Sequence, residues 1–226
     1  ARKAAAFDLS AACSGFIYSL ATATGMLKSG MYRNALVVGA ECLSRITDYT
    51  DRNTCILFGD GAGAVVLGEV PEGRGFRSFE LGADGSGGPL LKLAGGGSRM
   101  PASAETVSSK AHYIYMAGNE VFKFAVRIMG SAAEEALRKA GIDKKDVDLL
   151  VPHQANIRII QAALSRLELP EEKCMINLDR YGNASAASIP IALAEAVEQG
   201  RVSEGDCLVL VGFGGGLTWG ASVLIW

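Results

Sequence analysis

Apolar and polar positions follow each other in blocks that predict a chain of alternating strands and helices. The run at 34–40 (NALVVGA) is almost continuously apolar, which is typical of a strand buried on both faces. Apolar positions at helical spacing lie on one face of 119–140 and of 156–167. Together these patterns predict an α/β protein. The predicted strands are 4–9, 34–40, 61–70, 148–151, 175–178, 207–212 and 218–225, and the predicted helices are 13–28, 119–140, 156–167 and 185–199. Residues 82–116 are rich in Gly, Ser and Pro and are expected to form surface loops and short strands.

Part of this series occurs twice. Gly30 follows Cys13 by 17 residues, and Gly200 follows Asn183 by 17, so that each interval holds one predicted helix with a glycine at its end. A buried strand and then a second strand follow each helix, with similar sequences (ALVVGA and CLVLVG, then GAVVL and GASVL). We interpret this as an internal duplication with halves at 1–80 and 81–226. Because only 12 residues precede Cys13, we expect that about 100 residues are missing before Ala1.

Composition narrows the class of protein. Hydrophobic residues make up 49% and charged residues 20%, which excludes a disordered chain. Lys and Arg number 22 against 24 Asp and Glu, and a net charge of −2 provides no general basic surface for nucleic acid. The five cysteines show no C-x-x-C spacing, which argues against a disulfide framework or a zinc site and favours a reducing, cytoplasmic compartment.

Two uncharged stretches, 9–27 and 207–226, are about as long as a membrane span. The first contains five Ser and Thr residues and the second is interrupted by five glycines. Both therefore fit buried elements of a soluble protein better than a spanning helix, and we expect no membrane partner.

Three side chains that could carry chemistry occupy element ends. Cys13 lies where a strand meets a helix, where the helix N-terminus stabilises a thiolate, although a free Cys is also a common small core residue. His153 follows a buried strand, at the sheet edge where α/β sites form. Asn183 precedes the second helix of the repeat, in the place that Cys13 has in the first, and could also be an ordinary N-cap. The glycines of 212–216 let backbone N–H groups approach a substrate carbonyl, as an oxyanion hole requires.

A cysteine, a histidine and an asparagine in this order point to nucleophilic thiol chemistry. A papain-like protease has the same order, but its C-G-[SA]-C-[WY] signature is absent around Cys13. No His or acidic cluster has the spacing of metal ligands, so we expect no metal site.

Seven motifs carry a resemblance to one family. They are AFDLSAACSGF (6–16), TDRNT (50–54), FGDGAGAVVLG (58–68), MAGNEVFKFAV (116–126), VPHQANIRII (151–160), YGNASAASIP (181–190) and VGFGGGLTWG (211–220). In these motifs the chain resembles β-ketoacyl-acyl carrier protein synthase III, the condensing acyltransferase that initiates bacterial fatty acid synthesis. The resemblance implies a thiolase-like fold of five layers, αβαβα, built from two duplicated halves with mixed sheets. It also implies a cytoplasmic homodimer and a segment before the Cys motif.

The resemblance further implies the reaction and its residues. Cys13 accepts an acyl group from acyl-CoA, and malonyl-acyl carrier protein then loses CO₂ and condenses with it. His153 and Asn183 donate hydrogen bonds to the malonyl thioester oxygen, and the N–H groups of Cys13 and Gly215 form the oxyanion hole. The CoA thioester is a substrate, and no cofactor is implied.

Other positions match family roles in substrate binding and partner docking. Those matched to CoA, the pantetheine tunnel or the acyl pocket are Arg52, Phe58, Met116, Gly118, Phe122, Ala155, Asn156, Phe213 and Gly214. A basic patch of Lys123, Arg158 and Arg166 matches the docking site for the acidic carrier protein. The alternatives are another thiolase-fold condensing enzyme, either a polyketide-type synthase or a hydroxymethylglutaryl-CoA synthase, and a non-enzymatic assembly partner. The last would be expected to lack the Cys, His or Asn.

Overall fold

A computed structural model describes residues 3–226 and shows one four-stranded sheet as its centre. The sheet has the order β3-β8-β7-β6 and is mixed, because β6 runs parallel to β7 while the other neighbours are antiparallel. Its strands are β3 (Gly75–Ala83), β6 (Leu149–Pro152), β7 (Cys207–Gly214) and β8 (Thr218–Ile225). Every residue of β7 is buried, as its apolar run predicts for a strand covered on both faces.

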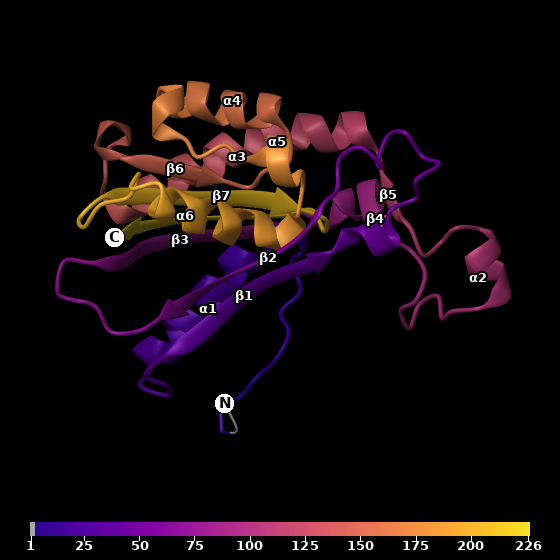
Figure 1. Ribbon diagram of the computed structural model, residues 1–226, viewed down its shortest axis with the longest axis horizontal. Coiled ribbons are helices and arrows are strands. Elements are labelled where there is room, and N and C mark those ends of the chain that lie inside the picture. Colours follow the sequence, from indigo (N-terminus) through magenta and orange to yellow (C-terminus); the bar gives the residue numbers. More distant parts are fainter. Residues whose placement is uncertain (1–2) are drawn as a thin grey trace.

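Helices cover both faces of this sheet (Figure 1). On one face lie α3 (Gly118–Ala140) and α4 (Ile157–Leu167). On the other lie α1 (Gly15–Lys28) and α6 (Ser188–Glu198), which are sandwiched between the central sheet and a second sheet. On α3, Ala125, Met129, Ala132 and Ala136 are buried as predicted, and Phe122 is half-buried.

The second sheet is the antiparallel pair β1 (Ala35–Cys42) and β2 (Asp60–Leu67). The order of layers, α3 and α4, central sheet, α1 and α6, then β1–β2, makes up four of the five layers of the thiolase-like α/β fold. Helix, strand, strand recurs as α1-β1-β2 and α6-β7-β8, in agreement with the repeat seen in the sequence.

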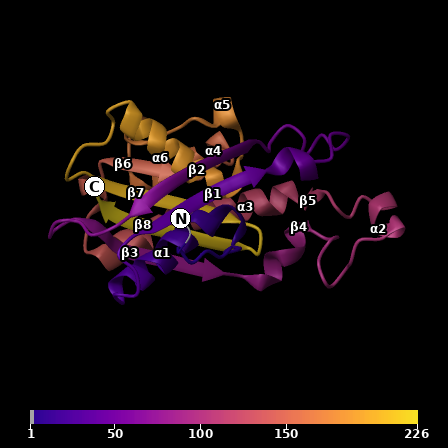
Figure 2. The same ribbon diagram turned by 60° about the horizontal axis from the view of Figure 1, so that its bottom comes forward.

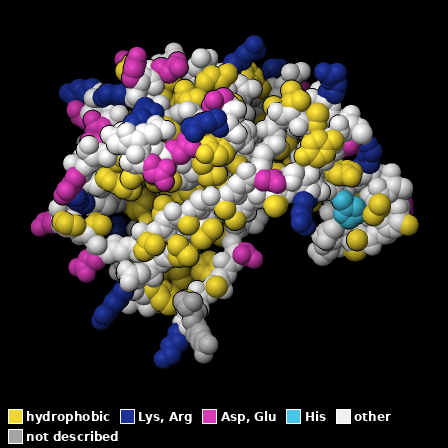
Figure 3. Space-filling view, in the orientation of Figure 1, with side chains coloured by type: hydrophobic (Ala, Val, Ile, Leu, Met, Phe, Trp, Pro, Cys, Tyr) yellow, Lys and Arg dark blue, Asp and Glu magenta, His cyan; other side chains and the backbone are white. Residues whose placement is uncertain are grey.

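The prediction that 34–40 is buried on both faces is wrong for this structure. Burial alternates along β1, and Leu36 and Val38 are 67% and 50% exposed. Only the face that carries Val37 packs against helices within residues 3–226. The outward side chains, together with Val66 of β2, form a strip of apolar surface along the strands (Figure 3).

Three other expectations need correction. Residues 4–9 form no strand, since they have no strand partner among residues 3–226. Residues 175–178 form no strand either; a single bridge joins Cys174 to Leu150 before a short helix begins. The boundary at 80/81 cuts through β3, which pairs with β8 along its length, so residues 75–80 belong to the central sheet.

The Gly-rich segment 82–116 forms loops and short strands, as predicted. Its strands β4 and β5 pair, and the excursion between them, which carries α2, projects from the body (Figures 1 and 2). The remaining elements are short: η1 (Ala12–Ser14), η2 (Leu43–Ile46), η3 (Gly85–Leu90), β4 (Leu91–Leu93), α2 (Ala104–Ser108), β5 (Ile114–Met116), η4 (Lys144–Asp146), η5 (Glu171–Lys173), α5 (Leu178–Tyr181) and η6 (Ser185–Ala187).

The two uncharged stretches become α1 and the β7–β8 pair. No helix within residues 3–226 is both long and apolar enough to cross a membrane.

Candidate active site

Cys13 lies in a sharp turn at the start of α1. The residue before it, Ala12, has φ of 48°, a left-handed conformation that non-glycine residues seldom adopt. The end of β7 approaches this turn so closely that a Cβ on Gly214 would lie 2.5 Å from the Cys13 nitrogen. Position 214 therefore requires glycine, because a side chain there would collide with the turn that carries Cys13. Gly214 also lines the cavity described below.

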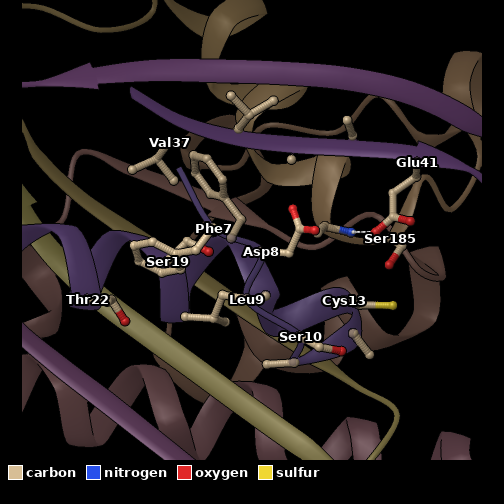
Figure 4. Close-up of a pocket in the computed structure, with 18 of the residues that line it drawn as sticks. Phe7, Asp8, Leu9, Ser10, Cys13, Ser19, Thr22, Val37, Glu41 and Ser185 are labelled. Atoms are coloured by element: carbon tan, nitrogen blue, oxygen red, sulfur yellow. Dashed lines mark hydrogen bonds between the residues drawn. The ribbon is translucent and has the colours of Figure 1, made fainter. Parts of the chain in front are cut away.

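The pKa of the Cys13 thiol is raised to about 11, chiefly because the side chain is buried. The hydroxyl of Ser185 lowers this pKa and the carboxylate of Glu41 raises it, and the desolvation effect exceeds both. The prediction of a stabilised thiolate is thus wrong in direction for the free protein. Figure 4 shows the sulfur of Cys13 at one end of the wider of two hollows that Cys13 lines, where Ser185 and Glu41 also lie.

His153 stands just beyond the end of β6. Its N–H donates to the carbonyl of Val211 (2.7 Å), and its ring Nδ1 lies 2.6 Å from Ser188 Oγ. The Ser188 hydroxyl also accepts from the Gln154 N–H (3.4 Å), and when it donates its own proton to Nδ1 the neutral ring carries its proton on Nε2. Burial lowers the pKa of His153 to about 3. The ring is therefore neutral at pH 7 and suited to donate a hydrogen bond from Nε2 rather than to act as a base.

Gln154, which sequence reasoning did not single out, holds the histidine loop in place. Its Nε2 donates to the carbonyls of Pro152 and Met175, and its Oε1 accepts from the Asn177 N–H. The side chain is 1% exposed and fully hydrogen-bonded. The VPHQAN motif thus combines residues that line the cavity, His153 among them, with one that ties the loop to residues 175–177.

Asn183 is clamped at its backbone and at one side-chain atom. Its N–H donates to the Leu57 carbonyl (2.8 Å), and its carbonyl accepts from the Gly59 N–H (2.9 Å). Its Oδ1 accepts from the Ser185 N–H (2.9 Å), which forms an Asx turn. Because that bond fixes the oxygen, the amide NH₂ remains as a donor. Asn183 is not a helix N-cap, because Ala184 holds that position for η6 and Ala187 for α6.

The 17-residue correspondence of Asn183 with Cys13 does not hold in the structure. Each half has a left-handed residue that opens a 3-10 turn, Ala12 (φ 48°) in η1 and Ser185 (φ 45°) in η6. Counting from these residues, the counterpart of Cys13 is Ala186. The intervals agree only because α6 is shorter than α1, with 11 residues against 14.

A cavity of about 560 Å³ brings the three candidate residues together. Cys13, His153 and Asn183 all line it, and they come from three different elements of the two halves. The predicted binding residues that also line it are Phe58, Met116, Gly118, Phe122, Ala155, Asn156, Phe213 and Gly214. The sequence did not indicate five other lining residues, because their residue types and positions carry no chemical signal. They are Leu57, Leu91, Asn119, Val121 and Ile159.

Of the predicted catalytic, oxyanion-hole and substrate-binding residues, two lie outside this cavity. Arg52 is exposed and does not line it, whereas its neighbour Asn53 does. Gly215 lines a wider hollow of about 1350 Å³ on the other side of Cys13. Within residues 3–226, the N–H groups of Cys13 and Gly215 donate to no carbonyl of the loops and turns.

The three basic residues differ in how free their charges are. Lys123 and Arg158 are exposed and form no ion pair with the described part of the chain, and Arg158 lines the cavity. Arg166, in contrast, donates from Nε to Glu134 (2.7 Å). Glu134 also pairs with Lys144 (2.7 Å), so Arg166 shares this one carboxylate with a second cation.

Residues 3–226 include no cluster of three or more His, Cys, Asp or Glu side chains arranged to hold a metal ion. All five cysteines are free thiols.

The buried His153 predicts a pH dependence of stability. Its folded pKa of about 3 lies below the unfolded value near 6.5. Between these values only the unfolded chain binds the proton, so the free energy of unfolding should fall by on the order of 4 kcal/mol as the pH drops from about 6.5 to 3. Denaturant unfolding of the intact protein measures this slope. The His153→Gln variant should show a smaller slope, and equal slopes would contradict the assignment.

Fold and site together define a thiolase-like condensing enzyme, with a cysteine, a histidine and an asparagine at one cavity between two repeated halves. The sequence model of "3-Oxoacyl-[acyl-carrier-protein (ACP)] synthase III" matches residues 7–85, and that of the C-terminal region of the same family matches residues 137–226. The chain belongs to the 3-oxoacyl-[acyl-carrier-protein] synthase III family.

Similar proteins agree with this assignment. A β-ketoacyl-[acyl-carrier-protein] synthase III of Desulfitobacterium hafniense (strain Y51) is 62% identical over the whole chain, which spans 68% of the length of that relative. The crystal structure of the synthase III of Thermus thermophilus superposes with a TM-score of 0.90 at 54% identity, covering 97% of this chain and 67% of that one. The priming β-ketosynthase of the R1128 polyketide pathway gives a TM-score of 0.86 at 38% identity, covering 97% and 65%.

Proposed function

We propose that the protein is a β-ketoacyl-acyl carrier protein synthase III that condenses an acyl-CoA primer with malonyl-acyl carrier protein in fatty acid biosynthesis. The observation that carries this proposal is the meeting of Cys13, His153 and Asn183 at one cavity within the scaffold of this family.

In the first half-reaction, the sulfur of Cys13 attacks the carbonyl carbon of the acyl-CoA. The bond from that carbon to the CoA sulfur breaks, CoA leaves as its thiol with the proton lost by Cys13, and an acyl-cysteine remains. The N–H groups of Cys13 and Gly215, which have no carbonyl partner in the neighbouring loops, are the donors for the transient oxyanion. The raised pKa of Cys13 means that proton removal accompanies attack rather than preceding it.

In the second half-reaction, malonyl-acyl carrier protein loses CO₂ and its thioester becomes an enolate. The electron pair left by the carbon–carbon bond forms the new bond to the acyl carbon, and Cys13 leaves as a thiol after taking up a proton. His153 from Nε2 and Asn183 from its NH₂ group supply two neutral donors to the thioester oxygen, where the negative charge develops. Neutral donors suit this step because a charged acid would protonate the enolate and stop the condensation.

Partners follow from the same proposal. The residues that line the 560 Å³ cavity take the pantetheine arm, and the exposed charges of Lys123 and Arg158 attract the acidic carrier protein. Arg166 contributes from within its ion pair with Glu134. We further propose a cytoplasmic homodimer that needs no cofactor beyond its thioester substrates. The five free thiols support a reducing, cytoplasmic compartment. The apolar strip of β1–β2 suits a contact with another protein and supports the homodimer.

A polyketide-type priming synthase or a hydroxymethylglutaryl-CoA synthase would share the Cys-His-Asn set. The higher identity to synthase III relatives (62%) than to the polyketide priming enzyme (38%) favours fatty acid biosynthesis. Loss of CO₂ from malonyl-acyl carrier protein during the condensation separates both decarboxylating synthases from a hydroxymethylglutaryl-CoA synthase.

The test is an acylation experiment on the intact protein. After incubation with acetyl-CoA, the peptide that carries Cys13 should gain the mass of one acetyl group, and hydroxylamine should remove it as expected for a thioester. The Cys13→Ser variant should show no hydroxylamine-sensitive label. Labelling of another cysteine, or none at all, would overturn the proposal.

A further inference from the structure

Glu41 of β1 makes one hydrogen bond that reaches into the candidate site. Its Oε1 accepts from the N–H of Ala186 (3.2 Å), which is the middle residue of η6 and the counterpart of Cys13 in the second half. This bond joins residues 145 positions apart in the sequence, one from each half of the duplication.

The same strand fixes Ala186 from a second direction. Gly39 lies two residues before Glu41 and faces the same side of β1. A Cβ at Gly39 would lie 2.4 Å from the Ala186 carbonyl oxygen, so the backbone of β1 runs against η6 there. Gly39 thus allows the approach, and the Glu41 carboxylate takes the free N–H at the start of the segment that leads into α6.

The neighbouring residue needs such support. Ser185 has φ of 45°, which is unfavourable for a residue with a side chain and persists only where the surroundings hold it. Its N–H holds Oδ1 of Asn183, and its hydroxyl acts on the Cys13 thiol. The Ser185 N–H and the Ala186 N–H belong to successive peptide units on either side of the strained Ser185. A shift of the Ser185–Ala186 peptide would therefore reach the Asn183 amide through the backbone of Ser185.

We propose that Glu41 is a positioning residue for the condensation step: by holding the Ala186 N–H it fixes the strained Ser185 turn and thereby aims the Asn183 amide into the cavity. The assignment of Glu41 to the condensation step rests on the proposed function. The positioning of Asn183 by Glu41 rests on the hydrogen bonds alone. Glu41 touches no substrate in this role.

Two substitutions of Glu41 test whether the hydrogen-bond acceptor for the Ala186 N–H is what matters. Glu41→Gln keeps an oxygen that can accept from Ala186, whereas Glu41→Ala leaves that N–H without a partner. In the intact protein, Glu41→Ala should slow condensation about tenfold and leave acylation of Cys13 by acetyl-CoA within about twofold. Glu41→Gln should restore condensation to within about threefold of the wild type. A general loss of structure would instead lower both half-reactions together.

Asp60→Asn is the control that matches Glu41→Gln, because it also removes a carboxylate charge and keeps an oxygen that can accept. Asp60 lies on the paired strand β2 and accepts from the Ser44 N–H (2.8 Å), so it also holds a 3-10 turn by a backbone N–H, but that turn is η2. This variant should leave the ratio of the two half-reactions unchanged.

A readout that is independent of activity completes the test. Amide hydrogen exchange at Ala186 should be at least about tenfold faster in Glu41→Ala than in the wild type, Glu41→Gln or Asp60→Asn. Unchanged exchange in Glu41→Ala, equal losses in both half-reactions, or failure of Glu41→Gln to restore condensation would overturn the proposal. A wild-type protein that neither acylates nor condenses would overturn the proposed function instead, and the exchange data would still decide the positioning.

Discussion

Replacing Asn183 by alanine should lower condensation about 100- to 1000-fold and leave acylation of Cys13 within a few-fold of the wild-type rate. The amide NH₂ is the group left free by the bond from Ser185 to Oδ1, and removing one donor aimed at developing negative charge commonly has an effect of this size. Acylation uses the backbone N–H groups of Cys13 and Gly215 and not this amide. The two half-reactions are measured separately, by mass of the Cys13 peptide and by formation of the β-ketoacyl thioester.

Two further variants sharpen this result. Asn183→Asp keeps the acceptor for the Ser185 N–H but cannot donate when ionised, so it should be as deficient in condensation as Asn183→Ala. Asn53→Ala is the control, because Asn53 lines the same cavity while its amide already donates to Asp51 (3.0 Å). It should leave the ratio of half-reactions unchanged. Equal losses of acylation and condensation in Asn183→Ala would remove the assigned role.

Gly59→Ala should destabilise the protein by at least about 3 kcal/mol and should also slow condensation. A Cβ at this position would lie 2.1 Å from the Tyr181 carbonyl oxygen, a backbone atom that cannot move alone. The Gly59 N–H donates to the Asn183 carbonyl, so any relief of the clash displaces Asn183 from its clamp. Denaturant unfolding measures the stability, and the condensation assay measures the displacement.

Gly25→Ala provides a control in which the expected change in stability has the opposite sign. Gly25 lies within α1, and a Cβ there meets no atom within 4 Å. Alanine should therefore stabilise the protein by up to about 1 kcal/mol through its helix propensity, with no change in condensation. If Gly59→Ala were as stable as Gly25→Ala, the close approach of residues 59 and 181 would be wrong.

Local patterns were sufficient to predict most elements of this fold. The strong periodicity of 119–140 and the apolar run of 207–212 correspond to α3 and β7. The weaker predictions failed where the outcome depends on a partner strand. Residues 4–9 have an apolar strand pattern but pair with nothing among residues 3–226. Residues 175–178 form no strand either, because the single bridge, between Cys174 and Leu150, lies just before them and a helical turn follows.

Electrostatics also depended on the surroundings. The position of Cys13 at a helix start predicts a lowered pKa, and burial instead raises it to about 11. Arg166 follows the same logic: its helical position predicts a solvent-facing charge, but Glu134 of α3 pairs with it across the helix contact. Neither Glu134 nor the depth of Cys13 is visible from the local sequence.

The sequence by itself determined the class of chemistry and the two-fold architecture, because the cysteine, the histidine and the asparagine each stand at the end of a strongly patterned element and the helix-strand-strand series recurs. Only the tertiary structure decided how these groups act: that Ser188 and burial leave His153 a neutral donor, that Ser185 turns the Asn183 amide, and that Ala186 rather than Asn183 is the counterpart of Cys13. The physical reason is that the chemical type of a side chain is local. Its protonation and direction are set by contacts between the halves, such as that of Glu41 with Ala186, which lie 145 residues apart in the chain.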